Sequence, residues 1–159
     1  MKIDILCVGK IKERFYTDAA NEYIKRLSRY VKLNIIEVKD EKTLEGASDH
    51  ENDLVRRADA KRLNVRIDQG AVLIPLCIEG DEKSSEELSR MITAYENKGV
   101  DHIQFVIGGS LGIDESIKNM GDIKLSFSKM TFPHQLMRVI LLEQLYRAYR
   151  IKNNEPYHK

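Results

Sequence analysis

A run of glycines after an apolar segment is the first place where the residue types favour ligand binding. The apolar residues 105–107 lead directly into Gly108-Gly109-Ser110-Leu111-Gly112. Glycine backbones can take positive φ and can approach a ligand without a Cβ in the way. The spacing does not match Gly-x-Gly-x-x-Gly, no acid ends the following strand, and Gly-Lys-Ser/Thr is absent. A nicotinamide cofactor and a nucleotide triphosphate are therefore disfavoured, and a plain turn remains the alternative.

A second loop, rich in hydroxyl groups, follows the apolar residues 125–127. Ser128-Lys129-Met130-Thr131 leads to Phe132, which precedes a proline and is biased to an extended conformation. Pro133 has a φ suited to a first helical turn, so the loop 127–132 should end sharply. Ligands of open α/β sheets bind beyond the carboxyl ends of the strands. We therefore expect a site formed by residues 76–80, 108–112 and 128–132.

The rest of the chain alternates strand and helix patterns that would position these loops. Strands are expected at residues 3–8, 33–38, 71–78, 103–107 and 125–127, and helices at 15–30, 54–65, 84–99, 113–119 and 133–152. Ser84 and Glu87 form a capping box, whereas residues 40–53 are acidic, lack an apolar period and are typical of a loop. Pro75 indicates an edge strand or an irregularity. The alternation predicts a single α/β domain over residues 1–159, a parallel sheet with helices on both faces.

The helix expected at 133–152 is apolar on every side in its first half. A helix of this kind must be buried all round, and one sheet covers only one of its sides. Few other helices remain to wrap it. We therefore expect a second copy of the chain to cover it about a two-fold axis, as a homodimer.

Composition bounds the class of protein. Hydrophobic residues make up 42% and charged residues 32% of the chain, no apolar run is long enough to span a bilayer, and no signal peptide is recognisable, so a cytoplasmic protein is expected. Cys7 and Cys77 lie in apolar runs, where a reduced, packed thiol is usual. The net charge is +1, yet bases dominate residues 10–32 and 124–152, and acids dominate 37–53. This segregation indicates either a local positive surface or ordinary solvated helix faces.

Several segments together resemble one known family. They are Phe105-Val-Ile-Gly-Gly-Ser, Leu125-Ser-Phe-Ser-Lys-Met-Thr-Phe-Pro-His-Gln, Arg138-Val, Glu143-Gln-Leu-Tyr-Arg-Ala and Pro156-Tyr157-His158. The whole chain is similar to the ribosomal large-subunit methyltransferase H family, a minimal member of the SPOUT methyltransferases. The resemblance implies S-adenosylmethionine as methyl donor, no metal, a homodimer, and a C-terminal trefoil knot. It also implies methylation at N3 of a pseudouridine in helix 69 of 23S rRNA within assembled ribosomes.

Carried over by position, the resemblance implies a donor site in the loops already singled out. Its residues are Leu76, Gly108, Phe127, Ser128, Lys129, Met130, Thr131 and Phe132. The flat, apolar faces of adenine suit flanking side chains such as Leu76 and Phe132, with backbone groups for its edge. Phe127 and Met130 have ordinary core packing as an equally good interpretation.

Methylation of a ring N3 requires that nitrogen to lose its proton, and histidine is the natural candidate at neutral pH. His158, beyond the last helix, is the expected catalytic residue, with Tyr157 stacking on the base and Arg147 holding phosphate. Arg147 is also one turn from Glu143 and would then simply pair with it. His134 adjoins the donor loop and is expected to bond locally at the helix start. His50 and His102 are assigned to loops, without a role.

Two other classes of function stay open. The first is a doubly wound binding or regulatory module such as a flavodoxin-like domain, although the strand ending at Gly9 carries neither an acidic cluster nor a phosphate loop. The second is a ribosome-associated binder without catalysis, which only an assay separates from the enzyme.

Overall fold

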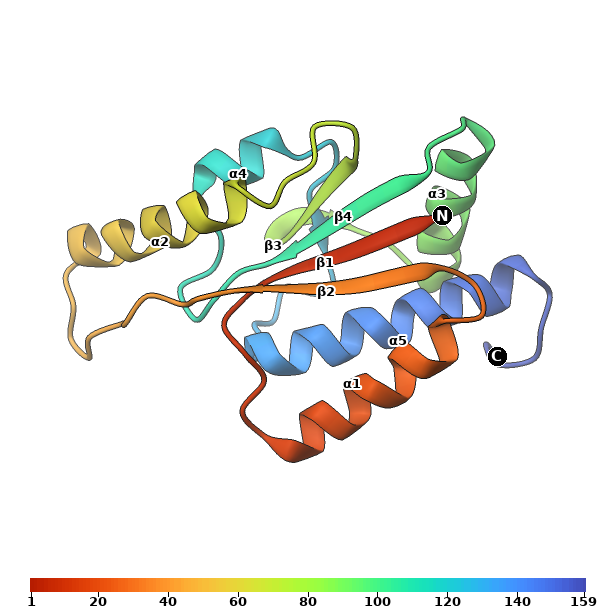
Figure 1. The fold of residues 1–159 in the computed structure, drawn as a ribbon, viewed down its shortest axis with the longest axis horizontal. Coiled ribbons are helices and arrows are strands. Elements are labelled where there is room, and N and C mark those ends of the chain that lie inside the picture. Colours follow the sequence, from red (N-terminus) through yellow and green to blue (C-terminus); the bar gives the residue numbers. More distant parts are fainter.

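One parallel sheet forms the centre of the computed structural model, which describes residues 1–159. Its strand order is β2-β1-β4-β3-β5 (Figure 1). The strands are β1 (Lys2–Val8), β2 (Lys32–Val38), β3 (Val72–Glu82), β4 (His102–Ile107) and β5 (Leu125–Ser126). The parallel sheet flanked by helices confirms the predicted α/β class.

Five helices cover the two faces of the sheet. They are α1 (Arg14–Leu27), α2 (Asp49–Asn64), α3 (Ser85–Asn97), α4 (Glu115–Met120) and α5 (His134–Lys152). Side chains alternate along each strand, so Ile5 and Phe105 pack with α1, α3 and α5, whereas Leu6 and Val106 pack with α2 and α4. None of the helices combines the length and apolarity needed to cross a bilayer.

The helix ends show where local patterns predict structure and where they do not. Ser84 and Glu87 form the predicted capping box at the start of α3. The loop predicted at 40–53 is wrong from Asp49 onward, because α2 begins there. Ser48 caps it by accepting a hydrogen bond from the Glu51 N–H at 3.2 Å, and such a cap satisfies a free N–H whatever the apolar period.

Strand β3 is irregular, as Pro75 predicts, but it is not an edge strand. Both Leu76 and Asp81 pair with Leu125 of β5, so the ladder is interrupted between them. At Gly80 the two backbones approach so closely that a Cβ would lie 2.7 Å from the Lys124 carbonyl carbon. The end of β3 is thereby pressed against β5.

Helix α5 is covered by its own chain more fully than the sequence predicts. Besides the sheet, α1 and α3 both pack along it, and Leu141, Leu142 and Leu145 are fully buried. In its first half, by contrast, Leu136, Met137, Val139 and Ile140 stay partly exposed, and Leu136 and Ile140 continue an apolar stripe that begins at the exposed Phe132. The second half of the helix is therefore wrapped within one chain, whereas cover of the apolar first half by a second copy stays a prediction.

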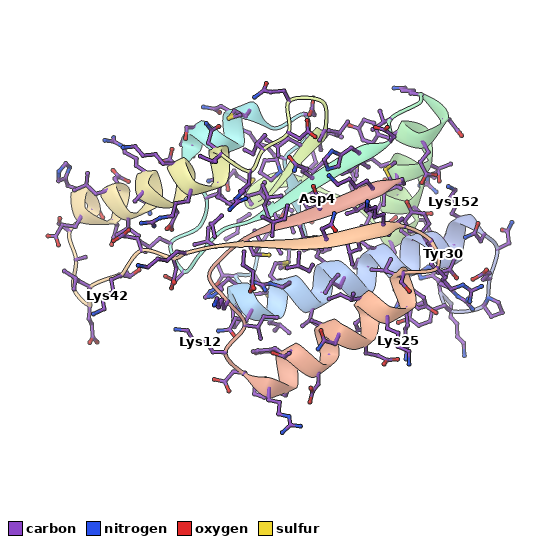
Figure 2. The ribbon with its side chains drawn as sticks, in the orientation of Figure 1. Asp4, Lys12, Lys25, Tyr30, Lys42 and Lys152 are labelled. Atoms are coloured by element: carbon purple, nitrogen blue, oxygen red, sulfur yellow. The ribbon has the colours of Figure 1, made fainter.

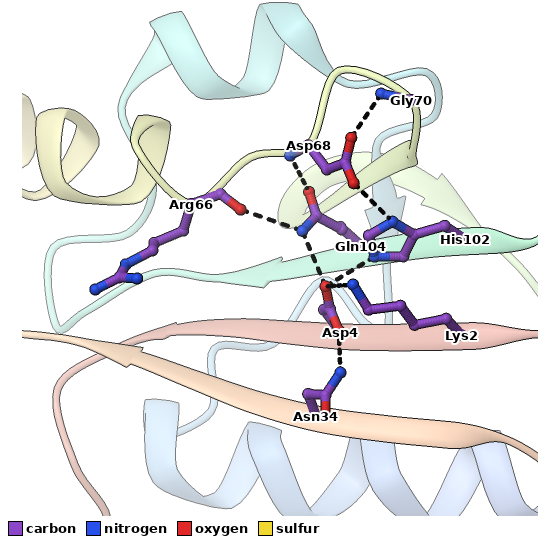
Figure 3. Close-up of polar contacts among 8 residues, drawn as sticks. All are labelled: Lys2, Asp4, Asn34, Arg66, Asp68, Gly70, His102 and Gln104. Atoms are coloured by element: carbon purple, nitrogen blue, oxygen red, sulfur yellow. Dashed lines mark hydrogen bonds and ion pairs between the residues drawn. The ribbon is translucent and has the colours of Figure 1, made fainter.

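A polar cluster lies at the amino-terminal end of the strands, on the face of α2 and α4 (Figure 3). Asp4, only 2% exposed, accepts hydrogen bonds from Asn34 at 2.7 Å and Gln104 at 3.2 Å. His102 lies with Nε2 2.7 Å from Asp4 and Nδ1 3.2 Å from Asp68. His102 thus belongs to β4, and assigning it to a loop was wrong.

We expect this cluster to make stability depend on pH through Asp4. Burial alone would raise the pKa of Asp4, but the hydrogen bonds from Asn34, His102 and Gln104 outweigh it and lower the pKa. Because the pKa of Asp4 is lower in the folded than in the unfolded chain, where it is near 4, the ionised carboxylate stabilises the fold above about pH 4. This stabilisation is lost as the pH falls through the folded-state pKa. Asp4→Asn should cost about 2 kcal/mol of unfolding free energy at neutral pH, and the difference from wild type should shrink below about pH 4. Denaturant titrations across this range measure it.

The matched control is Asp18→Asn on the exposed side of α1, where the carboxylate lies 3.8 Å from Arg14. It should cost little at any pH, because exposed ion pairs contribute little. A cost of Asp4→Asn that does not change with pH would contradict the expected linkage.

Candidate active site

A pocket of about 360 Å³ opens at the carboxyl ends of β3 and β4, beside β5. Its wall is built by three loops and the start of α5. The lining residues are Leu76, Cys77, Ile78, Glu79, Ile107 through Ile113, Lys118, Leu125 through Ser128, Met130, Thr131, Phe132, His134 and Met137. The volume suits a nucleoside-sized ligand, and the three loops are those expected from the strand-end rule.

The glycine loop folds back on itself at the wall of the pocket. Gly112 donates its N–H to the Gly109 carbonyl at 3.0 Å and takes a φ of 82°. A Cβ at Gly108 would lie 2.6 Å from the Gly112 carbonyl carbon. Position 108 must therefore be a glycine, because a side chain there would clash with the backbone of the same loop. Without a side chain at this position, the loop backbone lines the pocket.

Hydroxyl groups fix the second loop. The Ser126 hydroxyl donates to the Ser128 carbonyl at 3.0 Å, and the Met130 N–H donates to the Ser128 hydroxyl at 3.0 Å. These bonds hold residues 126–130 in a turn. Phe127, Met130 and Phe132 consequently reach the pocket wall together.

One ion pair lies in this largely apolar wall. Lys118 of α4 pairs with Glu79, which lies within the irregular part of β3 between Leu76 and Asp81, and its ammonium also lies 3.4 Å from Glu115. Burial favours the neutral amine, but the hydrogen bond to Glu79 raises the pKa of Lys118. The same bond lowers the pKa of Glu79. Both side chains are therefore charged, and each is the ion-pair partner of the other.

The first turn of α5 is fixed to the amino-terminal part of the chain. The Gln135 side chain accepts the Lys12 backbone N–H at 2.9 Å, and Figure 2 shows Lys12 beside this end of α5. Arg138, 3% exposed, donates to Glu37 at 2.7 Å and to the Gly9 carbonyl at 3.1 Å. The ends of β1 and β2 therefore hold α5 against the pocket.

Seven of the eight residues predicted for the donor site line this pocket: Leu76, Gly108, Phe127, Ser128, Met130, Thr131 and Phe132. Lys129, from the same loop, is exposed and does not line it. Sequence reasoning missed Lys118 and Met137 as lining residues, since each depends on how a helix is turned. Cys77 also lies in the wall, as a free thiol whose pKa is raised by burial.

The C-terminal tail lies away from the pocket of its own chain. Tyr157 donates its hydroxyl to Glu143 at 3.0 Å, and its ring packs edge-on against Tyr146 with centroids 4.8 Å apart. Arg147 lies over the Tyr157 ring and also bonds Glu143 at 3.1 Å, so the predicted pairing of Arg147 with Glu143 is present. None of these residues lines the pocket.

His158 is fixed by two partners. Its Nε2 lies 2.8 Å from Glu86 of α3, and its Nδ1 lies 3.2 Å from an Arg147 guanidinium nitrogen. A guanidinium only donates, so Nδ1 accepts and Nε2 carries the proton towards Glu86. In this arrangement no lone pair of the ring is free.

Hydrogen bonds also fix the C-terminal end of α5 to the tail. Arg150 donates to the Pro156 carbonyl at 2.6 Å and, with Tyr30, bonds Glu155. Figure 2 shows Tyr30 near this end of the helix. The tail is therefore an ordered part of the chain's surface.

A family model and a solved structure each match nearly the whole chain. The family model described as "Predicted SPOUT methyltransferase" matches residues 1–158. A solved structure, that of a probable methylase family protein from Haemophilus influenzae Rd KW20, covers 99% of this chain and 70% of its own with a TM-score of 0.57. Its sequence identity is 11%, so it supports the fold alone.

Curated relatives match over their full length. The ribosomal RNA large subunit methyltransferase H of Bifidobacterium animalis subsp. lactis is 55% identical over 159 residues, and that of Acetivibrio thermocellus is 52% identical over 159 residues. In each case 100% of both chains is covered. The chain therefore belongs to the SPOUT methyltransferases, and within them to the ribosomal RNA large subunit methyltransferase H family.

Proposed function

We propose that this chain transfers a methyl group from S-adenosylmethionine to N3 of a pseudouridine in helix 69 of 23S rRNA. The reaction takes place on assembled ribosomes in the cytoplasm. The observation that carries this proposal is the pocket itself, because the residues that correspond by position to the family's donor site come together there. A single domain over residues 1–159 and a trefoil knot in its C-terminal half belong to the same proposal.

The wall of the pocket fits the donor. Leu76, Phe127 and Phe132 offer apolar surface for the adenine faces, and the glycine loop offers backbone groups for polar edges. A Cβ at Gly108 would disrupt that loop. When bound, the sulfonium of S-adenosylmethionine supplies an electrophilic methyl group.

The tail needs a second chain to reach a pocket. His134 lies at the pocket, whereas Glu143, which bonds Tyr157, is nine residues further along α5, about 14 Å at 1.5 Å per residue. We propose that Tyr157 and His158 act on the target base in the partner's pocket, with Arg147 holding them and the RNA backbone. The catalytic unit is then a homodimer.

The dimer interface is proposed at the apolar stripe Phe132, Leu136 and Ile140. Ile140→Glu should convert the dimer to a monomer, because the interface would bury an unpaired carboxylate. Sedimentation or light scattering at micromolar concentration measures the mass. Val65→Glu is the matched control, since Val65 is 80% exposed at the far end of α2. A wild-type chain that is monomeric under these conditions would refute the interface.

The function is tested by transfer of labelled methyl from S-adenosylmethionine to intact ribosomes, compared with free 23S rRNA. We expect transfer to intact ribosomes, mapped to N3 of a helix 69 pseudouridine. S-adenosylhomocysteine should raise the melting temperature, as a native-state ligand must, and NADH and ATP should not. Donor binding without transfer would favour the ribosome-associated binder, and absence of donor binding would end the methyltransferase proposal.

A further inference from the structure

The pocket contains few groups that can accept a proton. Its titratable side chains are Cys77, Glu79, Lys118 and His134. Burial raises the pKa of Cys77 and keeps it a thiol, while Glu79 and Lys118 are charged and paired with each other. By elimination His134 is the one side chain of the wall with a lone pair available near neutral pH.

The surroundings of His134 favour its neutral form. The charged groups near its ring are Arg138 on its own helix, Lys12 of the β1–α1 loop and Asp40 of the β2–α2 loop. Burial and the two cations lower its pKa, and Asp40 opposes them only in part. His134 is also the first residue of α5, where the helix dipole disfavours a positive charge. No hydrogen bond within the chain contributes to this shift.

The tail histidine is in the opposite situation. Both ring nitrogens of His158 are engaged, by Glu86 and by Arg147, and the tail must reach a second chain to approach a donor at all. His134 lies in the wall of the pocket itself. The expected local hydrogen bond of His134 at the helix start is not formed, so its ring is free to face a ligand.

We propose that His134 is the proton acceptor for the target nucleotide. This inference rests on the proposed function and adds a residue to it. The N3–H proton passes to the free imidazole nitrogen, and the N3 electron pair forms the new bond to the methyl carbon. The carbon–sulfur bond breaks with its electron pair remaining on sulfur, and the imidazolium then releases its proton to water. Tyr157 and His158 orient the base from the partner chain.

The first test is independent of catalysis. Nitrogen-detected NMR of the histidine rings in the protein without substrate should follow His134 as the pH rises. The midpoint at which its ring loses the proton should lie below about pH 6.5, the ordinary histidine value. His134→Gln identifies the signal by its disappearance. A His134 ring that is still protonated at pH 7 would overturn the proposal.

The second test is the pH dependence of single-turnover methyl transfer to ribosomes with saturating donor. For wild type the rate should fall on acidification as His134 gains a proton. His134→Gln should lower the rate at neutral pH by about 100-fold or more and remove this acid limb, while calorimetry shows unchanged S-adenosylhomocysteine affinity. Added imidazole should partly restore transfer by His134→Ala. His50→Gln, on the exposed start of α2, is the matched control and should behave as wild type.

The outcomes separate the two proposals. Wild type that binds no donor or transfers no methyl defeats the proposed function. Active wild type with an unaltered rate in His134→Gln overturns the role of His134 alone. A slow His134→Gln that keeps its acid limb and gains nothing from imidazole also overturns it, since His134 would then only position groups. Loss of the acid limb in His158→Gln would assign the proton to the tail.

Discussion

Gly108→Ala will lower the affinity for S-adenosylhomocysteine by more than tenfold, or about 1.4 kcal/mol. The added methyl would lie 2.6 Å from the Gly112 carbonyl carbon and 2.9 Å from the Ile113 side chain. Backbone cannot yield as a flexible side chain can, so the glycine loop must open. The wall that this loop contributes to the pocket then changes shape. Isothermal calorimetry measures the affinity, and circular dichroism verifies the fold.

Gly70→Ala is the matched control. The nearest atom to its Cβ would be an Asp68 carboxylate oxygen at 3.4 Å, an ordinary contact in a loop outside the pocket. The affinity of Gly70→Ala for S-adenosylhomocysteine should equal that of wild type. Wild-type affinity in Gly108→Ala would mean that the donor binds without this loop, and the site would have to be sought elsewhere.

Deletion of residues 156–159 will leave the fold and donor binding nearly intact but lower methyl transfer by about 100-fold, the scale of a lost catalytic group. The deletion removes Tyr157 and His158 while the pair of Arg147 with Glu143 remains. Because the tail does not line the pocket, donor affinity should not change. His158→Ala should account for much of the loss by freeing the tail from Glu86.

A mixing experiment decides whether the tail acts across the dimer. The tail-deleted chain keeps an intact pocket, and Gly108→Val keeps an intact tail. Neither homodimer should be active, but the mixed dimer combines one good pocket with one good tail and should regain transfer. If mixing restores nothing, the tail acts within its own chain. If the deleted protein transfers at the wild-type rate, the tail has no part in the reaction.

The parts of this structure that depend on near neighbours could be predicted from the sequence. The capping box of Ser84 and Glu87 joins residues three apart, and the strand-end rule placed the three pocket loops correctly. The cap at Ser48 is equally local but was overlooked, because residues 49–53 carry no apolar period. Contacts between distant residues could not be predicted. The pair of Asp4 with His102 joins positions 98 apart, and no local pattern marks it.

The rotation of α4 and α5 about their axes explains why two residues of the pocket wall could not be predicted. Lys118 and Met137 reach the wall only because α4 and α5 are rotated to face it, and sequence period alone does not fix that rotation relative to a pocket. The knot is a property of the whole path of the chain, so periodicity gives no information on it. It stays a prediction from the family resemblance.

The attachment of α5 to Gly9 and Lys12 has a consequence for biosynthesis. These contacts join residues 129 and 123 positions apart, so they form only after nearly the whole chain has been translated. Contacts this distant in sequence are also slow to form. A nascent chain still attached to its own ribosome through the last helix has the glycine loop but lacks the wall contributed by His134 and Met137. We therefore expect the pocket wall to stay incomplete until the last helix has left the ribosome.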